Sequence, residues 1–191
     1  MERLQDKIWV TRKSRIEASE RLLRNDLHSH LLINYYALFV VIIAVYDLYD
    51  NKANLTLLSV ISSILVLTTS IFISSKNFKE RSNFLKSCYL KLELIQEKIK
   101  SLSDDEKKSK YYEVSEEYND VLRNSENHLS VDFTKIKLSI PKKDRQQSTQ
   151  ISWNEYISYS IYLFLRLASL TILYILPAII TFTYYMVYAS S

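Results

Sequence analysis

The sequence predicts an all-α integral membrane protein, made of a transmembrane helical hairpin, a cytoplasmic helical hairpin with coiled-coil spacing and a third, C-terminal transmembrane helix. The 191 residues include no glycine, so the chain lacks the residue on which tight β-hairpins and phosphate-binding loops depend. Residues 55–75 carry no charge and would form a helix of about 31 Å, which matches the hydrocarbon core of a bilayer. Two further apolar runs accompany this stretch.

Residues 1–30 are predicted to form a cytoplasmic, basic, amphipathic helix. Glu17 precedes Arg21 by four residues and Glu20 precedes Arg24 by four, in the acid-then-base order that favours a helix. Apolar residues add a partial hydrophobic face. The helix would lie on the membrane or pack on the soluble part, and a solvated leader is the alternative.

Residues 31–75 are predicted to form the transmembrane hairpin. The first apolar run, residues 31–46, would give about 24 Å of helix, a short span for which flanking tyrosines could supply interfacial anchors. Only residues 47–54 separate it from the second run. We therefore expect the two spans to form a tight antiparallel pair.

The second span carries a stripe of hydroxyl side chains. At about 100° per residue, its members fall within an arc of about 60°. Such a stripe can line a water-filled path once several copies surround an axis, with two apolar residues at mid-depth forming a constriction. The alternative, which the pattern alone favours, is that these small hydroxyl residues let membrane helices pack closely. The predicted pore-lining residues are Thr56, Ser59, Ser63, Val66, Leu67, Ser70 and Ser74, and Thr68 lies off the stripe.

Residues 76–156 are predicted to form a cytoplasmic coiled-coil region with a linker. Apolar residues alternate at spacings of three and four, as in the a/d seam of a coiled coil. They would join two helices of one chain or also pair between subunits, and the leading hypothesis is a homo-oligomer. The seam consists of Leu85, Cys88, Leu92, Ile95, Ile99 and Leu102.

Two further features divide this region. Ser103 and Glu106 have the spacing of a capping box that opens another helix, in which the apolar spacing continues through residues 111–122. Residues 130–152 have no clear periodicity, and residues 141–148 read as a polar, solvated linker. The linker's basic residues lack the aromatic residues of a nucleic-acid-binding surface, so no direct nucleic-acid binding is expected.

Residues 157–191 are predicted to form the third span. No charged residue follows Arg166, whose side chain is expected to extend to the near interface. Pro177 should kink the helix. Tyr184, Tyr185 and Tyr188 cluster where an aromatic belt would lie.

The distribution of basic residues predicts the orientation. Lys and Arg are concentrated in residues 1–30 and 76–160, whereas the loop between the first two spans has only Lys52. By the positive-inside rule, the N-terminus and residues 76–156 are cytoplasmic, and three spans place the C-terminus outside the inner membrane.

The sequence gives little support for catalysis. His28 and His30 are two residues apart, so on a helix they point nearly opposite ways and cannot share a metal. The single cysteine, Cys88, lies on the predicted seam, where a small apolar residue suffices. We expect no catalytic residues, no cofactor and no metal site.

Two stretches resemble the start and the cytoplasmic portion of the SLATT family. The first is IWVTRKSRI at residues 8–16, followed by ERL at 20–22 and NYY at 34–36. The second is NSENH at residues 124–128, with Asp132 beyond it. SLATT proteins are two-span effector domains associated with SMODS nucleotidyltransferases and SLOG nucleotide-sensing domains. The third span resembles that of a subgroup often encoded beside reverse transcriptases.

The resemblance implies an effector of a prokaryotic anti-phage conflict system, which opens pores when a cytoplasmic sensor detects infection and so kills or arrests the cell. The sensor would be a nucleotide-signalling protein or a reverse transcriptase. We expect the basic arm, with Trp9, Arg12 and Arg15, to couple that signal to the spans. The alternative is a non-conducting membrane adaptor that anchors a partner enzyme through its cytoplasmic coiled coil.

Overall fold

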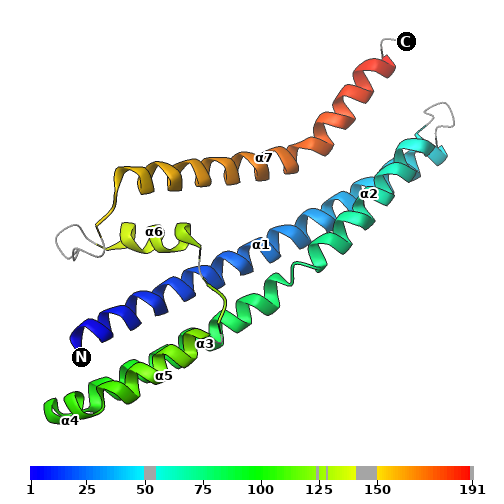
Figure 1. Ribbon diagram of the computed structural model, residues 1–191. Coiled ribbons are helices and arrows are strands. Elements are labelled where there is room, and N and C mark those ends of the chain that lie inside the picture. The colour runs from blue at the N-terminus through cyan, green and yellow to red at the C-terminus, as the bar shows by residue number, and fades with distance from the viewer. Residues whose placement is uncertain (50–54, 124, 128, 141–149, 190–191) are drawn as a thin grey trace. The chain divides into compact units, whose positions relative to one another are not determined.

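A computed structural model describes residues 1–49, 55–123, 125–127, 129–140 and 150–189. These residues form seven α-helices and no strand, which confirms the all-α prediction (Figure 1). Three helical stretches are long and apolar enough to cross a membrane, by length and composition: α1 (Glu2–Tyr49), the stretch beginning with α2 (Thr56–Ser74), and α7 (Trp153–Ala189).

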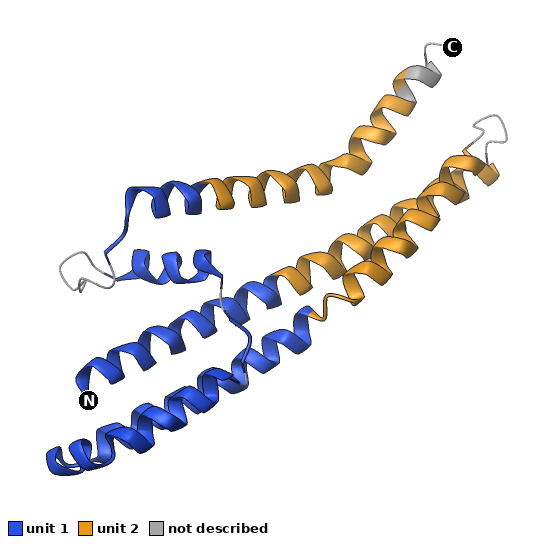
Figure 2. Ribbon diagram, in the orientation of Figure 1, with its two compact units in different colours: residues 1–24, 78–160 blue, residues 25–77, 161–191 orange. Residues whose placement is uncertain are grey.

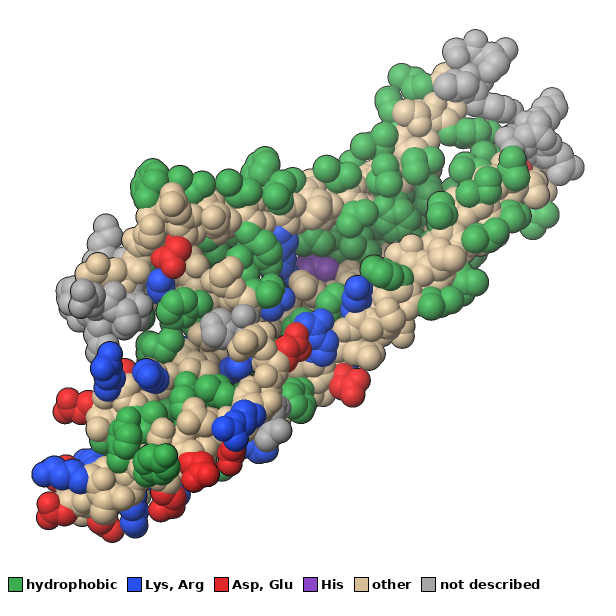
Figure 3. All heavy atoms as spheres, in the orientation of Figure 1, with side chains coloured by type: hydrophobic (Ala, Val, Ile, Leu, Met, Phe, Trp, Pro, Cys, Tyr) green, Lys and Arg blue, Asp and Glu red, His purple; other side chains and the backbone are tan. Residues whose placement is uncertain are grey.

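The chain divides into two compact units (Figure 2). Unit 1 comprises residues 1–24 and 78–160, and unit 2 comprises residues 25–77 and 161–191. The predicted division into residues 1–30, 31–75, 76–156 and 157–191 stays a prediction. Figure 3 shows charged side chains over unit 1, whereas the side chains over unit 2 are largely hydrophobic. Composition thus separates the two units as clearly as geometry does.

Unit 2 contains the second part of α1, together with α2 and most of α7. The loop between α1 and α2 lies partly outside the described residues, but its two ends are joined. The carboxylate of Asp47 accepts from the backbone N–H of Leu55 at 2.7 Å and from Thr56 Oγ1 at 2.5 Å. One acidic side chain at the end of α1 therefore supplies the polar partners with which α2 begins.

Asn77 separates α2 from α3 (Phe78–Ser101). Its φ angle is +48°, in the left-handed region that glycine usually occupies at the end of a helix. Asparagine tolerates this region better than other side-chain-bearing residues, and the chain has no glycine to place there. The backbone N–H groups of Ser75, Lys76 and Asn77 donate back to the last turns of α2. The apolar helix α2 therefore ends in a capped turn before the charged helix α3 begins.

The core of unit 1 is built on the predicted seam. Four of its residues (Cys88, Leu92, Ile95 and Ile99) pack in one buried cluster with Leu4 and Ile8 of α1 and with Val114 and Tyr118 of α5 (Tyr111–Arg123). Leu85 is buried in a second cluster, with Ala18 and Leu22 of α1, and Leu102 is half-buried. The seam is therefore covered by the chain's own helices, and a further role between subunits stays a prediction.

Two serines bring α1 and α3 close together. Ser19 Oγ donates to the backbone carbonyl of Ser82 at 3.1 Å, and Ser82 Oγ donates to the carbonyl of Ser19 at 2.9 Å. Their hydroxyl oxygens are 2.8 Å apart. Both residues are buried, so side chains this small are needed to let the two backbones approach.

The predicted capping box is confirmed. Ser103 accepts from the backbone N–H of Glu106, whose carboxylate accepts from the N–H of Ser103, and together they open α4 (Asp104–Ser109). The sequence predicts one helix after this cap, but the structure contains two, because α5 begins after Lys110.

Helix α6 (Ser130–Ser139) was not predicted. Its apolar residues do not gather on one face, so it gives no periodic signal. Asp132 caps its first turn by accepting from the N–H of Leu129 at 3.0 Å. Lys135 pairs with Glu17 of α1, and Ile136 is buried. The predicted linker, residues 141–148, lies outside the described residues.

The seam can be tested by comparing two leucines of α3. Leu92 is fully buried, whereas Leu94 is 63% exposed. Leu92→Ala should lower the free energy of unfolding by about 2–5 kcal/mol, because it leaves a cavity in the core. Leu94→Ala should change it by less than about 0.5 kcal/mol. Thermal unfolding of the full chain in detergent, followed by circular dichroism, measures both, and equal losses would contradict this packing.

Candidate functional site

Two groups of residues are candidates for function: the hydroxyl stripe on α2 and a network of arginines in unit 1. On α2, the stripe is split between two environments. Ser59, Val66 and Ser70 are half-buried, on the edge that packs within unit 2. The other edge is exposed. No described residue of α2 is fully buried, so the contrast is between half-buried and exposed side chains. The exposed edge consists of Thr56, Ser63, Leu67 and Ser74.

The stripe hydroxyls with described hydrogen bonds find partners within the chain. Ser63 Oγ donates to the backbone carbonyl of Ser59 at 2.7 Å, and Ser59 Oγ donates to that of Thr56 at 3.1 Å. A serine bonded to its own helix can face lipid without leaving a donor unsatisfied. The exposed edge is therefore compatible with a single chain in lipid and with a polar surface between copies. The pore-lining role stays a prediction.

The two residues of the predicted constriction are placed differently. Val66 borders a cavity that α2 shares with α1 and α7 in unit 2. Leu67 is 61% exposed and lies on the outward edge. In the single chain only Leu67 belongs to the outward surface, and the constriction stays a prediction.

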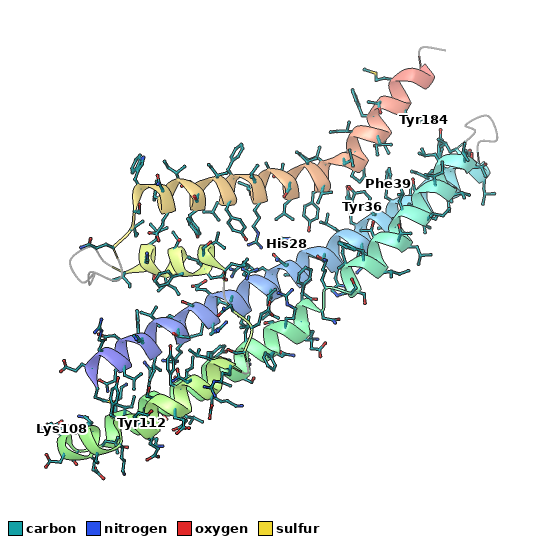
Figure 4. The ribbon with its side chains drawn as sticks, viewed as in Figure 1. His28, Tyr36, Phe39, Lys108, Tyr112 and Tyr184 are labelled. Carbon is teal, nitrogen blue, oxygen red and sulfur yellow. The ribbon has the colours of Figure 1, made fainter. Side chains whose placement is uncertain are left out.

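Polar side chains join α1 to α7 within unit 2, and the sequence analysis did not foresee this. Arg166 Nη2 donates to Asn25 Oδ1 at 3.0 Å. His28 Nδ1 lies 3.4 Å from the hydroxyl of Tyr174 (Figure 4). Asn25, His28 and Tyr36 fall within an arc of about 80° on α1. This polar face was the only feature of the sequence that could have indicated a contact with another helix. Arg166 thus contacts α1, and the extension of its side chain to the near interface stays a prediction.

Pro177 explains the third contact between these helices. Proline has no N–H, so it cannot donate to the carbonyl of Leu173, four residues earlier. Tyr36 of α1 donates its hydroxyl to that carbonyl at 2.8 Å. A carbonyl left free inside a bilayer is unfavourable, and a neighbouring helix commonly satisfies it. Figure 1 shows α7 bending in its C-terminal half, where Pro177 lies inside the helix.

In unit 1, the two stretches that resemble the SLATT family contact one another. Arg15, from the first, donates through Nη2 to Asn127 Oδ1, from the second, at 3.3 Å. Arg21 forms a two-pronged pair with Asp132, with its Nε and Nη2 atoms 2.8 Å and 3.1 Å from the carboxylate oxygens. Over a hundred residues separate the partners in the sequence, so no local pattern reveals the pairing.

Arginines of α1 and α3 complete this network. Arg12 pairs with Glu93 and donates to Gln96 Oε1 at 3.3 Å, both on α3. Arg81 donates to Glu126 and holds the pKa of that carboxyl below its ordinary value, mainly through the hydrogen bond. Trp9 lies outside the network: it is 36% exposed, with the ammonium of Lys13 over its ring.

Arg15 is the least satisfied member of the network. Its residue is 1% exposed, yet among the described residues no group accepts from its Nε or Nη1 atoms. Burial lowers the pKa of its guanidinium, because desolvation disfavours the charged form. A buried charge with so few partners destabilises the fold that contains it. Such residues are often kept for a functional reason.

No group of three His, Cys, Asp or Glu side chains that could hold a metal occurs among the described residues. The fold and these sites define an all-helical membrane protein with one charged unit and one largely apolar unit.

The model of SMODS and SLOG-associating 2TM effector domain family 5 matches residues 1–183, so the chain belongs to this SLATT family. The match extends almost to the end of α7 and so includes the third apolar helix, although the family's description counts two spans. The comparisons with curated proteins and with solved structures found no match.

The arginine network predicts opposite effects for two substitutions. Arg15→Met should leave the free energy of unfolding unchanged or raise it by about 1–4 kcal/mol, because an apolar side chain replaces an under-paired buried charge. Arg21→Met should lower it by about 3–5 kcal/mol, because Asp132 would remain buried without its partner. Urea unfolding in detergent compares the two. A loss at Arg15 as large as that at Arg21 would mean that Arg15 is fully paired.

The contact at Pro177 can be tested with a double-mutant cycle. Tyr36→Phe should destabilise the chain by about 0.5–2 kcal/mol, because the Leu173 carbonyl loses its donor. In a Pro177→Ala background the new N–H can donate to that carbonyl, so Tyr36→Phe should have almost no effect. Tyr35→Phe is the matched control, and its effect on the free energy of unfolding should be the same with Pro177 and with Pro177→Ala. An equal effect of Tyr36→Phe in both backgrounds would disprove the link.

Proposed function

We propose that the chain is a membrane-permeabilising effector of a prokaryotic anti-phage conflict system. Its membership of a family of effector domains supports the general class. The observation that carries the specific proposal is the exposed edge of α2, where Ser63 and Ser74 are exposed and Thr56 is exposed while its hydroxyl donates to Asp47. Copies of α2 arranged around an axis would turn this edge toward a shared path.

Conduction requires several copies, because the edge lies on the outside of a single hairpin. The hydroxyls of Thr56, Ser63 and Ser74 would line the path, with Leu67 as an apolar ring between them that closes by dewetting. The carboxylate of Asp47 bonds to Thr56 and lies at the end of the stripe, where it would favour cations. The subunits are homo-oligomeric in this proposal.

The arginine network in unit 1 would receive the trigger. It connects α1 with α3 and with the segment that contains Asn127 and Asp132, and it holds Arg15 buried with few partners. A cytoplasmic sensor that released Arg15 to water would relieve an unfavourable burial. Because α1 continues without a break into unit 2, a change in its first part would reach the spans. The N-terminus and residues 76–156 face the cytoplasm of the inner membrane in this proposal, with the C-terminus outside.

One observation favours the alternative, a membrane adaptor for a partner enzyme. Leu90 and Leu94 are exposed on α3, four residues apart, on the side away from its buried seam. Adjacent exposed leucines on a charged unit are suited to contact with another protein. An adaptor would use this surface and would need no path through α2.

Membrane potential distinguishes the two functions. Bacteria expressing the intact chain from a tight inducible promoter should depolarise, as measured with a voltage-sensitive dye. Ser63→Leu should abolish the depolarisation, because it places a bulky apolar side chain on the outward edge. Thr68→Leu is the matched control, since Thr68 is an exposed hydroxyl residue of the same helix that lies off the stripe.

Equal membrane abundance of the variants is required for this comparison. Loss of depolarisation in both variants would show that the effect of a leucine substitution on α2 does not depend on its position on the stripe. The adaptor would replace the pore if the wild type did not depolarise the cells and a bound partner protein behaved as follows. The partner would still be retained by the Ser63→Leu variant and would be lost from the Leu94→Asp variant.

A further inference from the structure

Unit 2 contains an apolar cavity between α1, α2 and α7 that no part of the proposed function uses. Its volume is about 540 Å³, within the range of small-molecule sites. Phe39 and Ile42 of α1, Leu58 of α2, and Ala178 of α7 are among the residues that line it. A second cavity of about 390 Å³ shares Phe39 and Ile180 with the first, so the two form neighbouring parts of one fissure.

The cavity lies where α7 bends. Pro177 lines it and is fully buried, and the residues that follow run along its side. At one end, Phe39 and Tyr184 pack against the buried pair Ile43 and Leu55 (Figure 4). The helices are therefore held together above and below the cavity, by this cluster and by the Tyr36 hydrogen bond to Leu173. The gap between them is a feature of the packing, bounded on three sides by the chain.

The surroundings restrict what can fill this space. Water does not stably occupy a cavity whose walls are mostly apolar, and an empty cavity of this size would be destabilising. A helix from another copy is too thick, since at about 10 Å in diameter little more than one turn would fit in 540 Å³. The spans that form the walls are surrounded by lipid in a membrane, so the flexible acyl chains of lipids are available to fill the cavity.

Three of the four hydroxyl-bearing residues that line the cavity lie toward one end. Tyr46 lines it near the end of α1, and Thr181 and Tyr184 line it near the end of α7. At the opposite end, Pro177 lines the cavity together with a single hydroxyl-bearing residue, Tyr35. Tyrosines near helix ends are typical of the membrane interface, where lipid headgroups lie. This gradient fits an amphiphile whose polar end lies near Tyr46 and whose hydrocarbon chain points inward.

We propose that the cavity binds one acyl chain of a membrane phospholipid. The chain inserts between α7 and the hairpin of α1 and α2, with its headgroup at the Tyr46 end. The bound lipid fills the gap that the Pro177 bend creates and becomes part of the packing of unit 2. This site rests on the membrane location of the spans and is independent of whether α2 conducts ions.

Native mass spectrometry of the full chain tests the site. Protein extracted from bacterial membranes and washed extensively in detergent should retain about one phospholipid per chain. Ala178→Trp should reduce the retained fraction at least about tenfold, because the indole occupies the cavity. Ile179→Trp is the matched control: its neighbouring position is 51% exposed and does not line the cavity, so retention should match the wild type.

A second measurement needs no substitution. A phospholipid with a photoreactive diazirine midway along its acyl chain should label Leu38, Ile42 and Thr181 after the detergent wash, as mapped by peptide mass spectrometry. Three results would overturn the proposal: no retained lipid in the wild type, equal retention in the Ala178→Trp and Ile179→Trp variants, or labelling confined to outward residues. A change of subunit number in Ala178→Trp without loss of lipid would instead assign the cavity to a second copy. None of these outcomes depends on ion conduction.

Discussion

The uninterrupted course of α1 from Glu2 to Tyr49 is the constraint on which the rest of the structure depends. No glycine or proline interrupts this segment, so one helix passes from a charged region into an apolar one. In unit 1 it contributes the arginines that reach α3 and the Asn127–Asp132 segment. In unit 2 it contributes the polar side chains that reach α7. The arginine network of unit 1 and the polar contacts with α7 in unit 2 therefore both have members on this one helix.

The polar contacts of the two units serve different physical needs. Unit 1 pairs arginines with carboxylates and amides across helices that also share an apolar core, so the charges select a particular arrangement of the helices. Arg15 departs from this pattern, since its burial is unfavourable and a single amide is its only hydrogen-bond partner among the described residues. In unit 2 there is little water to compete, and each polar group requires a partner within the protein. Tyr36 serves that purpose where Pro177 removes a backbone donor.

The third apolar helix is integrated with the other two. It contacts α1 through Arg166, Tyr174 and the Leu173 carbonyl, and it borders both cavities of unit 2. The family match also extends over most of it. Its bend at Pro177 separates it from the hairpin over part of its length, which leaves room for a lipid chain. The helix thus braces the hairpin at defined points, and the outward edge of α2 stays exposed.

The sequence by itself determined the features that depend on local order. The spacing of Leu85, Cys88 and Leu92 predicted a buried seam, the Ser103–Glu106 pair predicted a cap, and uncharged runs predicted the spans, because each depends on residues within a few turns of one another. Only the tertiary structure decided that the seam is covered within one chain and that the α2 stripe is divided into two edges. It also decided that Arg15 meets Asn127 and that Tyr36 meets Leu173. The two residues of each pair lie over a hundred positions apart in the sequence. Helix periodicity predicts which face of a helix is apolar or polar, but it does not predict which other element packs against that face.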